Sequence, residues 1–192
     1  RLAARLLAAT NSPLLAPRRH DLPLDILGKK WLLTVDSGDL RPEGIVRYRC
    51  DELRGFDHLQ AWISHLAVCA VRPAGVVPAT RHLAFNGDLC FDALPPEEAR
   101  RFLAELVGLY AAGMDRPVPF FRRSAWAFAE KEGRQKIAAA QNKWRGIKDG
   151  QTEPEGADGW HSLAWRGVVD PLASPFPEIA ALVFDPIMRH RT

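Results

Sequence analysis

The sequence predicts an α/β fold in which a mixed sheet is flanked by helices. The stretch from Trp31 to Val71 carries the main observation, because its residues are typical of strand, turn, strand and then helix. A second strand pair is expected over 80–91, and apolar residues recur at helical spacing after Pro96. An apolar fraction of 47% and a charged fraction of 26% are those of an ordinary soluble globular protein, so we expect no extensive disorder.

Length and charge set broad limits. At 192 residues the chain can bury a substantial core and is most simply one domain. A net charge of +3 permits a nucleic-acid partner without requiring one. No apolar run approaches the ~20 residues that span a bilayer, and no signal peptide opens the sequence. We therefore expect no membrane partner and a cytoplasmic location.

The beginning of the chain resembles the end of a larger region. Residues 1–10 are typical of the last turns of a helix, and 14–23 of a connector that carries proline and arginine. Residues 24–27 can form a short strand. We assign 1–23 to a truncated helix and connector from a preceding region, and 24–192 to the domain itself.

The central stretch predicts two strands and a helix. The strands are Trp31–Val35 and Ile45–Arg49, with turns over 37–39 and 42–44. Asp57 can cap the helix that follows. The apolar positions expected on its buried face are Leu59, Trp62, Ile63, Leu66 and Ala70.

Later segments extend the pattern. Asn86-Gly87 predicts a type I′ turn between strands 80–85 and 88–91. A helix should open at Pro95 and Pro96, bury Tyr110 and close at Gly113. Ser124 can cap another helix. We expect 147–159 to be a surface loop and a short helix over 178–184.

The two central strands are arranged as in a metal-dependent nuclease. Such an enzyme places an acidic residue on one strand and an Asp-x-Lys-like pair on the next, so that carboxylates bind a divalent cation. Here the second strand carries Arg47-Tyr48-Arg49, and Asp36 is the carboxylate left on the first. Guanidinium groups are always protonated and cannot bind a metal. The sequence therefore predicts a nuclease-like frame without its catalysis and without a metal site.

Arg47 and Arg49 are the first candidate DNA-binding residues. Strand alternation places both on one face, opposite Val46 and Tyr48. Two guanidinium groups on one face suit bidentate contacts with phosphate. The alternative is a solvated sheet face with salt bridges to carboxylates. These would be Asp51, Glu52 or Asp36.

A second basic cluster follows the middle of the chain. Its candidate DNA-binding residues are Arg122, Arg123, Lys143 and Arg145, with further basic residues between them. Aromatic residues are interleaved: Phe120, Phe121, Trp126 and Trp144. Together these could hold a phosphate backbone and stack on unpaired bases. The alternative places the aromatic residues in the core and the charges on a solvated helix face.

Other chemistries have no pattern in this sequence. His58 and His65 are two helical turns apart and join no cysteine or glutamate pattern, and the three cysteines, 19 and 21 residues apart, form no zinc signature or disulfide framework. Cys69 and Cys90 are expected to be buried thiols. GxxxxGK[ST] and GxSxG are absent, so we expect neither ATP binding nor a serine hydrolase.

Several blocks resemble one known family. VRYRCDELRGFDHLQAWISHLAVCA, RPVPFFRRSAWAFAE, KWRG and the terminal WHSLAWRG with VFDPIMRH are similar to the C-terminal region of the exodeoxyribonuclease V gamma-subunit (RecC) family. The similarity starts near Leu24 and keeps order and spacing to the end. The family proteins are several times longer. The resemblance implies a restriction-endonuclease-like (PD-(D/E)XK-type) fold that is catalytically inactive.

The resemblance also implies a role. The family's bacterial subunit hydrolyses neither ATP nor DNA and holds together the two motor subunits. It helps to part the incoming duplex and channels the separated strands in double-strand-break repair by homologous recombination. The implied partners are the beta and alpha subunits, RecB and RecD, and double-stranded or forked DNA. ATP and Mg²⁺ would be used by those partner subunits, with no cofactor in this chain. Chi recognition belongs to another part of the family protein and is not transferred.

Two alternatives stay open. In one, the chain is a cryptic metal-dependent nuclease in which Asp36 joins Asp39, Glu43 or Asp51 in a metal site. In the other, it is a protein–protein scaffold that does not contact DNA. Magnesium or manganese binding would favour the first, and weak, salt-insensitive behaviour towards DNA the second.

Overall fold

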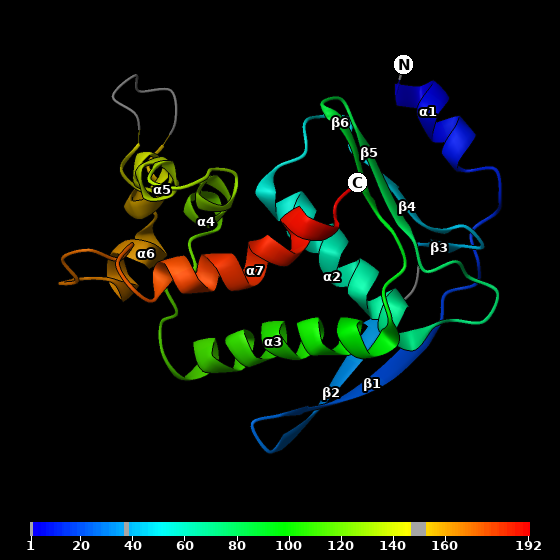
Figure 1. The fold of residues 1–192 in the computed structure, drawn as a ribbon, viewed down its shortest axis with the longest axis horizontal. Coiled ribbons are helices and arrows are strands. Elements are labelled where there is room, and N and C mark those ends of the chain that lie inside the picture. The colour runs from blue at the N-terminus through cyan, green and yellow to red at the C-terminus, as the bar shows by residue number, and fades with distance from the viewer. Residues whose placement is uncertain (1, 37–38, 147–152) are drawn as a thin grey trace. The chain divides into compact units, whose positions relative to one another are not determined.

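A computed structural model describes residues 2–36, 39–146 and 153–192 (Figure 1). The described chain forms two compact units. Unit 1 comprises Arg1–Gly108 with His190–Thr192, and unit 2 comprises Leu109–Arg189. Unit 1 holds all the strands of the described residues, and unit 2 is helical.

The main sheet of unit 1 has four strands in the order β3-β4-β5-β6. Their bounds are Leu40–Arg41, Gly44–Tyr48, Thr80–Ala84 and Gly87–Phe91. β4 and β5 are parallel, while β3 with β4 and β5 with β6 are antiparallel. A parallel pair needs a crossover connection, which here is a helix. The expectation of a mixed sheet flanked by helices is confirmed.

That crossover helix is α2 (Gly55–Val71). Trp62, Leu66 and Ala70 are buried as expected, but Ile63 is 42% exposed. Asp57 is not the N-cap residue. It is the third helical residue, and its carboxylate accepts a hydrogen bond of 2.8 Å from the backbone N–H of Arg54, the actual N-cap. Asp57 therefore stabilises the start of α2 from within its first turn, as the acidic residue of a capping box does.

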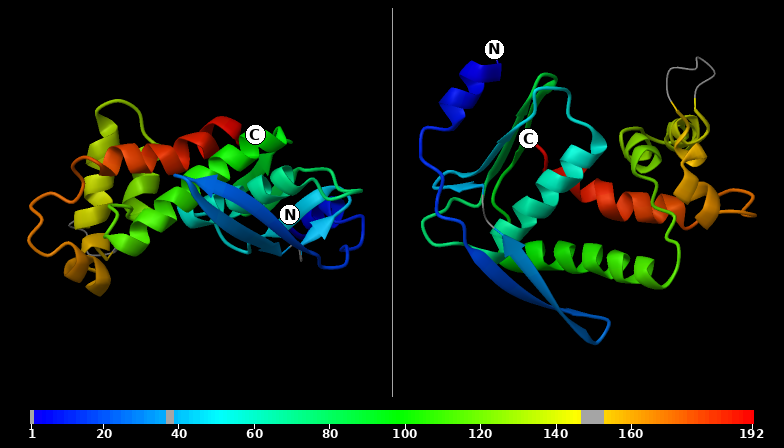
Figure 2. Two further views of the ribbon diagram at one scale, coloured as in Figure 1. Left: turned by 90° about the horizontal axis from the view of Figure 1, so that it is seen from below. Right: turned by 180° about the vertical axis from the view of Figure 1, so that it is seen from behind.

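The opposite face of the sheet is covered in part by α1 (Leu2–Ala9) (Figure 2). Leu2, Ala9 and Leu83 form a buried cluster, and Val46 packs against it. Arg5 also bonds the carboxylate of Asp88 in β6. The helix expected from the first ten residues is therefore confirmed.

A separate two-stranded sheet precedes the main one. Its strands are β1 (Arg19–Ile26) and β2 (Lys29–Asp36), which pair with each other along their whole length. The expected connector over 14–23 therefore contains half of a strand, and the strand of 24–27 is longer than predicted. Pro23 is tolerated because an edge strand can lack an N–H donor. The expected turn over 37–39 falls largely outside the described residues.

The predicted hairpin of β5 and β6 forms, but its turn differs by one residue. Ala84 pairs with Gly87, so the turn residues are Phe85 and Asn86 rather than Asn86-Gly87. The side-chain oxygen of Asn86 accepts a 2.9 Å hydrogen bond from the backbone N–H of Leu53. The Asn-Gly pair alone predicted a type I′ turn over 86–87. The long-range bond to Leu53 instead holds Asn86 as the second residue of a turn over 85–86.

The last residues of the chain complete unit 1. Arg191 bridges Phe91 in an antiparallel arrangement, and Thr192 exchanges two backbone hydrogen bonds with Cys90. The ring of His190 stacks on that of Trp62 with centroids 5.5 Å apart. Residues 190–192 therefore pair with the outer edge of β6.

The long helix α3 (Pro96–Asp115) opens where the two prolines predict. Gly113 does not close it, and Tyr110 is 65% exposed rather than buried. Buried positions are confined to the first half of the helix, at Ala99, Phe102 and Leu103. Gly113 needs no left-handed backbone here, so the helix continues through it.

The helices of unit 2 are short. They are α4 (Arg122–Ala129), α5 (Gln135–Arg145), η1 (Glu155–Ala157), α6 (Gly159–Ala164) and α7 (Phe176–His190). The helix expected over 178–184 is thus part of a longer α7. Ser124 is the third residue of α4 rather than its cap, which is Phe121. None of the helices in the described ranges is long and apolar enough to cross a membrane.

Candidate nucleic-acid interface

Arg47 in β4 and Arg49, which directly follows the strand, point to the same side, as strand alternation predicts, and that side faces α2. The Arg47 guanidinium donates to Asp39 at 2.9 Å and to the Ser64 hydroxyl of α2 at 3.0 Å. Arg49 donates to Asp57 in the first turn of α2 at 3.0 Å. Both guanidinium groups therefore connect the strand to the crossover helix.

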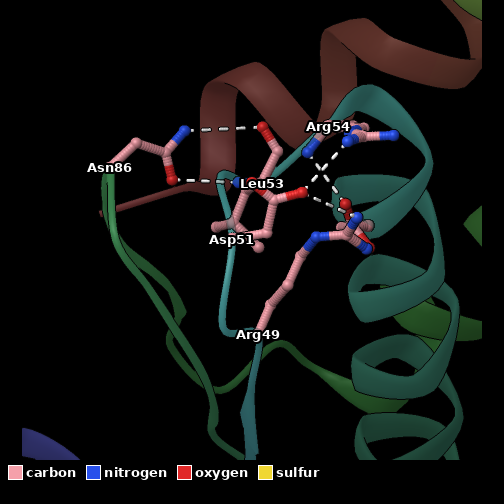
Figure 3. A network of polar contacts seen from close by, with 6 residues as sticks. Arg49, Asp51, Leu53, Arg54 and Asn86 are labelled. Carbon is pink, nitrogen blue, oxygen red and sulfur yellow. Dashed lines mark hydrogen bonds and ion pairs between the residues drawn. The ribbon is translucent and has the colours of Figure 1, made fainter. Parts of the chain in front are cut away.

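Arg49 belongs to a wider polar network (Figure 3). It also pairs with Asp51 at 3.4 Å, and Asp51 pairs with Arg54 at 3.0 Å. The backbone N–H of Glu52, followed by the side chain of Arg49, lowers the pKa of Asp51. One of the carboxylates expected in the salt-bridge alternative thus does pair with Arg49.

Of the carboxylates considered for a nuclease site, Asp36 and Asp39 lie together, whereas Glu43 and Asp51 lie elsewhere. Asp36 and Asp39 line one cavity of about 160 Å³, where Arg47 is the cation among them. Glu43 lines another cavity, of about 500 Å³, and Asp51 lies in the network around Arg49. In the part of the chain that the structure describes, no three His, Cys, Asp or Glu side chains are grouped to hold a metal ion.

The other predicted residues lie close to one another in unit 2. Phe121 precedes Arg122 and Arg123 at the start of α4, and its ring lies 4.2 Å from that of Trp144. Trp144 in turn lies between Lys143 and Arg145 at the end of α5. The structure therefore gathers these basic residues at one end of a pair of packed helices.

A buried carboxylate fixes this end. Glu155 is 5% exposed and accepts hydrogen bonds from the backbone N–H groups of Arg123 and Ser124, at 2.8 and 2.7 Å. It also accepts from the Ser124 hydroxyl at 2.8 Å. A negative charge at a helix N-terminus is favourable, because the unpaired N–H groups and the helix dipole point towards it. The expected surface loop of 147–159 thus contains a buried structural residue.

Aromatic packing supports the same junction. A Cβ added to Gly156 would lie 2.7 Å from Cε2 of Trp144, so only glycine fits there. Nδ1 of His161 lies 2.9 Å from the Glu155 carbonyl oxygen, and the His161 ring packs edge-on against Phe121. Phe121 is buried and Trp144 half-buried. These aromatic rings hold the helices together, as the core alternative expected.

The basic residues of this junction differ from those of β4 in their partners. Among the residues that the structure describes, Arg123, Lys143 and Arg145 have no carboxylate partner within ion-pair distance, and neither have Lys131 and Arg134. Cations without a carboxylate partner among the described residues remain available to phosphate. We name Arg123, Lys143 and Arg145 the junction cations; Arg122 precedes them in α4 and is not counted among the cations without a partner.

The β1–β2 hairpin has an unusual tip. Leu27 and Gly28 form its turn with φ of +52° and +74°, and the Leu27 side chain is 97% exposed. A left-handed backbone costs a leucine roughly 1–2 kcal/mol. The exposed Lys29 and Lys30 follow directly. A two-residue hairpin turn requires positive φ at both central residues, so this turn places a strained, exposed leucine at the tip.

Comparison with known proteins identifies the family. A model of the RecC C-terminal domain matches residues 1–133. The chain belongs to the RecC C-terminal domain family. It is also 26% identical over 148 residues to the RecBCD enzyme subunit RecC of Escherichia coli (strain K12). That match covers 71% of this chain and 13% of the relative, so the chain spans a small part of the RecC subunit it matches.

Sequence reasoning missed Leu27, Glu155 and the exposed Trp160 of α6 as residues of interest. Leu27-Gly28 is not a usual turn dipeptide, and a lone glutamate in an acidic, Gly-rich stretch carries no sign of burial. Trp160 lies in a block that resembles the family, and nothing in that block indicates exposure. Its exposure of 76% follows from how α6 packs, which no local pattern specifies.

Proposed function

We propose that this chain is a non-catalytic DNA-guiding and subunit-docking domain of an ATP-dependent helicase–exonuclease complex that acts in recombinational repair. Membership of the RecC C-terminal domain family and similarity to a RecBCD subunit support this assignment. The partners would be the beta and alpha subunits, and ATP and Mg²⁺ would be used by them. This chain would hydrolyse neither ATP nor DNA.

The proposed fold is that of a restriction endonuclease that has lost its catalytic residues. The β4–α2–β5 crossover supports this proposal, since Arg47 in β4 and Arg49 just after it stand where a nuclease would carry a carboxylate and lysine. The carboxylate paired with Arg47, Asp39, lies 2.8 Å from its guanidinium group, which takes the place of a metal ion beside it. In this proposal the two guanidinium groups stand where a metal site would otherwise be, and their hydrogen bonds stabilise the fold there.

The observation that carries the DNA-guiding role is the gathering of the junction cations at one end of α4 and α5. Phosphate contacts give salt-dependent, sequence-independent affinity, which suits a domain that guides DNA without reading it. The hairpin tip adds an apolar side chain at Leu27 with lysines beside it. Apolar side chains of DNA-binding proteins insert between base steps and unstack them. The hairpin therefore suits a place where a duplex is opened.

The test is binding of this chain to forked DNA across a salt series, with and without magnesium. Log affinity should fall with log salt, and Lys143→Ala with Arg145→Ala should reduce the slope by about 0.9 for each phosphate that the variant no longer neutralises. Arg101→Ala is the matched control, because Arg101 is exposed but pairs with Glu105 at 3.0 Å. It should leave the slope unchanged.

Three results would contradict the proposal. No binding at low salt would favour a pure protein–protein scaffold, and an unchanged slope in the double variant would place the DNA elsewhere. Cleavage that depends on magnesium and is lost in Asp36→Ala would instead support a cryptic nuclease.

A further inference from the structure

Trp160 differs from the other tryptophans in its exposure. Trp160 is 76% exposed, whereas Trp62 is 1% exposed. Of the tryptophans that the structure describes, Trp160 is the one that belongs to the large exposed apolar residues. Its backbone is nevertheless well fixed, because its N–H donates to the N-cap carboxylate of Asp158 at 3.0 Å. A large amphipathic ring presented to solvent from a fixed backbone is typical of a binding residue.

The neighbour of Trp160 places it at the junction. The ring of His161 lies 5.2 Å from that of Phe121 and 5.7 Å from that of Trp144. Phe121 and Trp144 lie within two residues of the junction cations in the chain. The beginning of α6 is therefore tied to the same end of the α4–α5 pair, and an exposed indole accompanies the cations there.

We propose that Trp160 stacks on an unpaired base and that the junction binds single-stranded DNA, with phosphates held by Arg123, Lys143 and Arg145. This inference rests on the proposed DNA-guiding function and assigns the separated strand a site and a stacking residue in this chain. Proteins that bind single strands without sequence preference combine a basic surface with aromatic rings, because every base offers a face for stacking. In an intact duplex those faces are covered by neighbouring bases, so an exposed indole gains little there.

A protein partner is the competing occupant, and α6 offers a way to separate the two. Leu163 lies about one turn after Trp160 and is 59% exposed. An apolar protein interface would bury both side chains, whereas base stacking needs only the indole. Leu163→Ala is therefore the matched control for Trp160→Ala.

The experiment measures affinity of the 192-residue chain for oligo(dT) and for a blunt duplex at one salt concentration. Stacking on an aromatic residue is worth about 1–3 kcal/mol per base, so Trp160→Ala should weaken oligo(dT) binding about fivefold or more. Trp160→Phe should retain most of the affinity. Duplex affinity in Trp160→Ala, and oligo(dT) affinity in Leu163→Ala, should change less than about twofold.

Unchanged oligo(dT) affinity in Trp160→Ala would overturn the inference, and so would equal losses for both DNAs or equal losses in both variants. The double variant Lys143→Ala with Arg145→Ala then separates the two proposals. If its log affinity depends less steeply on log salt than that of the wild-type chain, the DNA-guiding function stands and only the stacking role fails. If the wild-type chain binds neither DNA, both proposals fail together.

Discussion

Arg49 supplies the sharpest test of what holds unit 1 together. Its partner Asp57 is 9% exposed at the side chain and Arg49 is 33% exposed. Removing one partner of a buried pair costs about 3–5 kcal/mol, while exposed pairs contribute about 0–1 kcal/mol. Since water can reach Arg49, and since Asp57 keeps the N–H of Arg54, we expect Arg49→Ala to lower the free energy of unfolding by about 2 kcal/mol.

The assay compares the midpoints of urea unfolding, which report changes in stability as long as the m-value is unchanged. Arg54→Ala is the control, because the Arg54–Asp51 pair is 71% and 50% exposed and should contribute about 0.5 kcal/mol or less. Combining Arg49→Ala with Asp57→Asn completes a double-mutant cycle in which the asparagine keeps an acceptor for the helix cap. The reasoning fails if Arg49→Ala costs no more than Arg54→Ala, or if the cycle is additive within about 0.5 kcal/mol.

Two further predictions concern acid stability and the hairpin tip. Burial lowers the pKa of His65 from 6.5 to about 4, so the unfolded chain binds the proton first as pH falls. Stability should therefore decline from pH 6.5 towards pH 4, by at most about 1.4 kcal/mol per pH unit from this residue, and the decline should be shallower in His65→Gln when urea midpoints are compared across pH. An equally steep decline in that variant would show that His65 is not the cause. At the hairpin tip, Leu27→Asn should raise the unfolding free energy by up to about 1 kcal/mol, because asparagine tolerates a left-handed backbone, yet weaken fork opening by the assembled complex. Leu32→Asn, within a strand of the same hairpin, should not raise the unfolding free energy, because asparagine is disfavoured in strands, and should leave fork opening unchanged. A destabilised Leu27→Asn would contradict the argument.

The sequence predicted features that depend on local chemistry. The period of two along 45–49 placed Arg47 and Arg49 on one face, and the first helix, the crossover helix and the hairpin of 80–91 were all expected. Their ion pairs were left open, because a strand face with two arginines is equally compatible with phosphate or carboxylate partners. For that reason the effect of Arg47→Ala with Arg49→Ala on DNA binding should be interpreted only alongside stability.

Features that depend on distant partners could not be predicted. β2 pairs with β1 rather than with a strand of the main sheet, and strand choice is decided by tertiary packing. Ser124 was expected to cap α4, but the N-cap residue is Phe121, and the carboxylate that accepts from the first N–H groups of α4 is Glu155, 31 residues further along the chain than Ser124. The gathering of the junction cations depends on the same long-range contacts. The sequence therefore indicated these residues as candidates but did not show that they lie close together in the fold.

The pairing of Arg191 with Phe91 has a consequence for how the chain is made. These residues are separated by 100 positions, and unit 2 is synthesised between them. At a translation rate of about 5–20 residues per second, the outer edge of β6 waits roughly 5–20 s on the ribosome for its last partner. An unpaired strand edge is a site for aggregation during that interval. Folding of unit 1 is thus completed only after unit 2 has left the ribosome, so a nascent chain stalled within unit 2 would expose this edge.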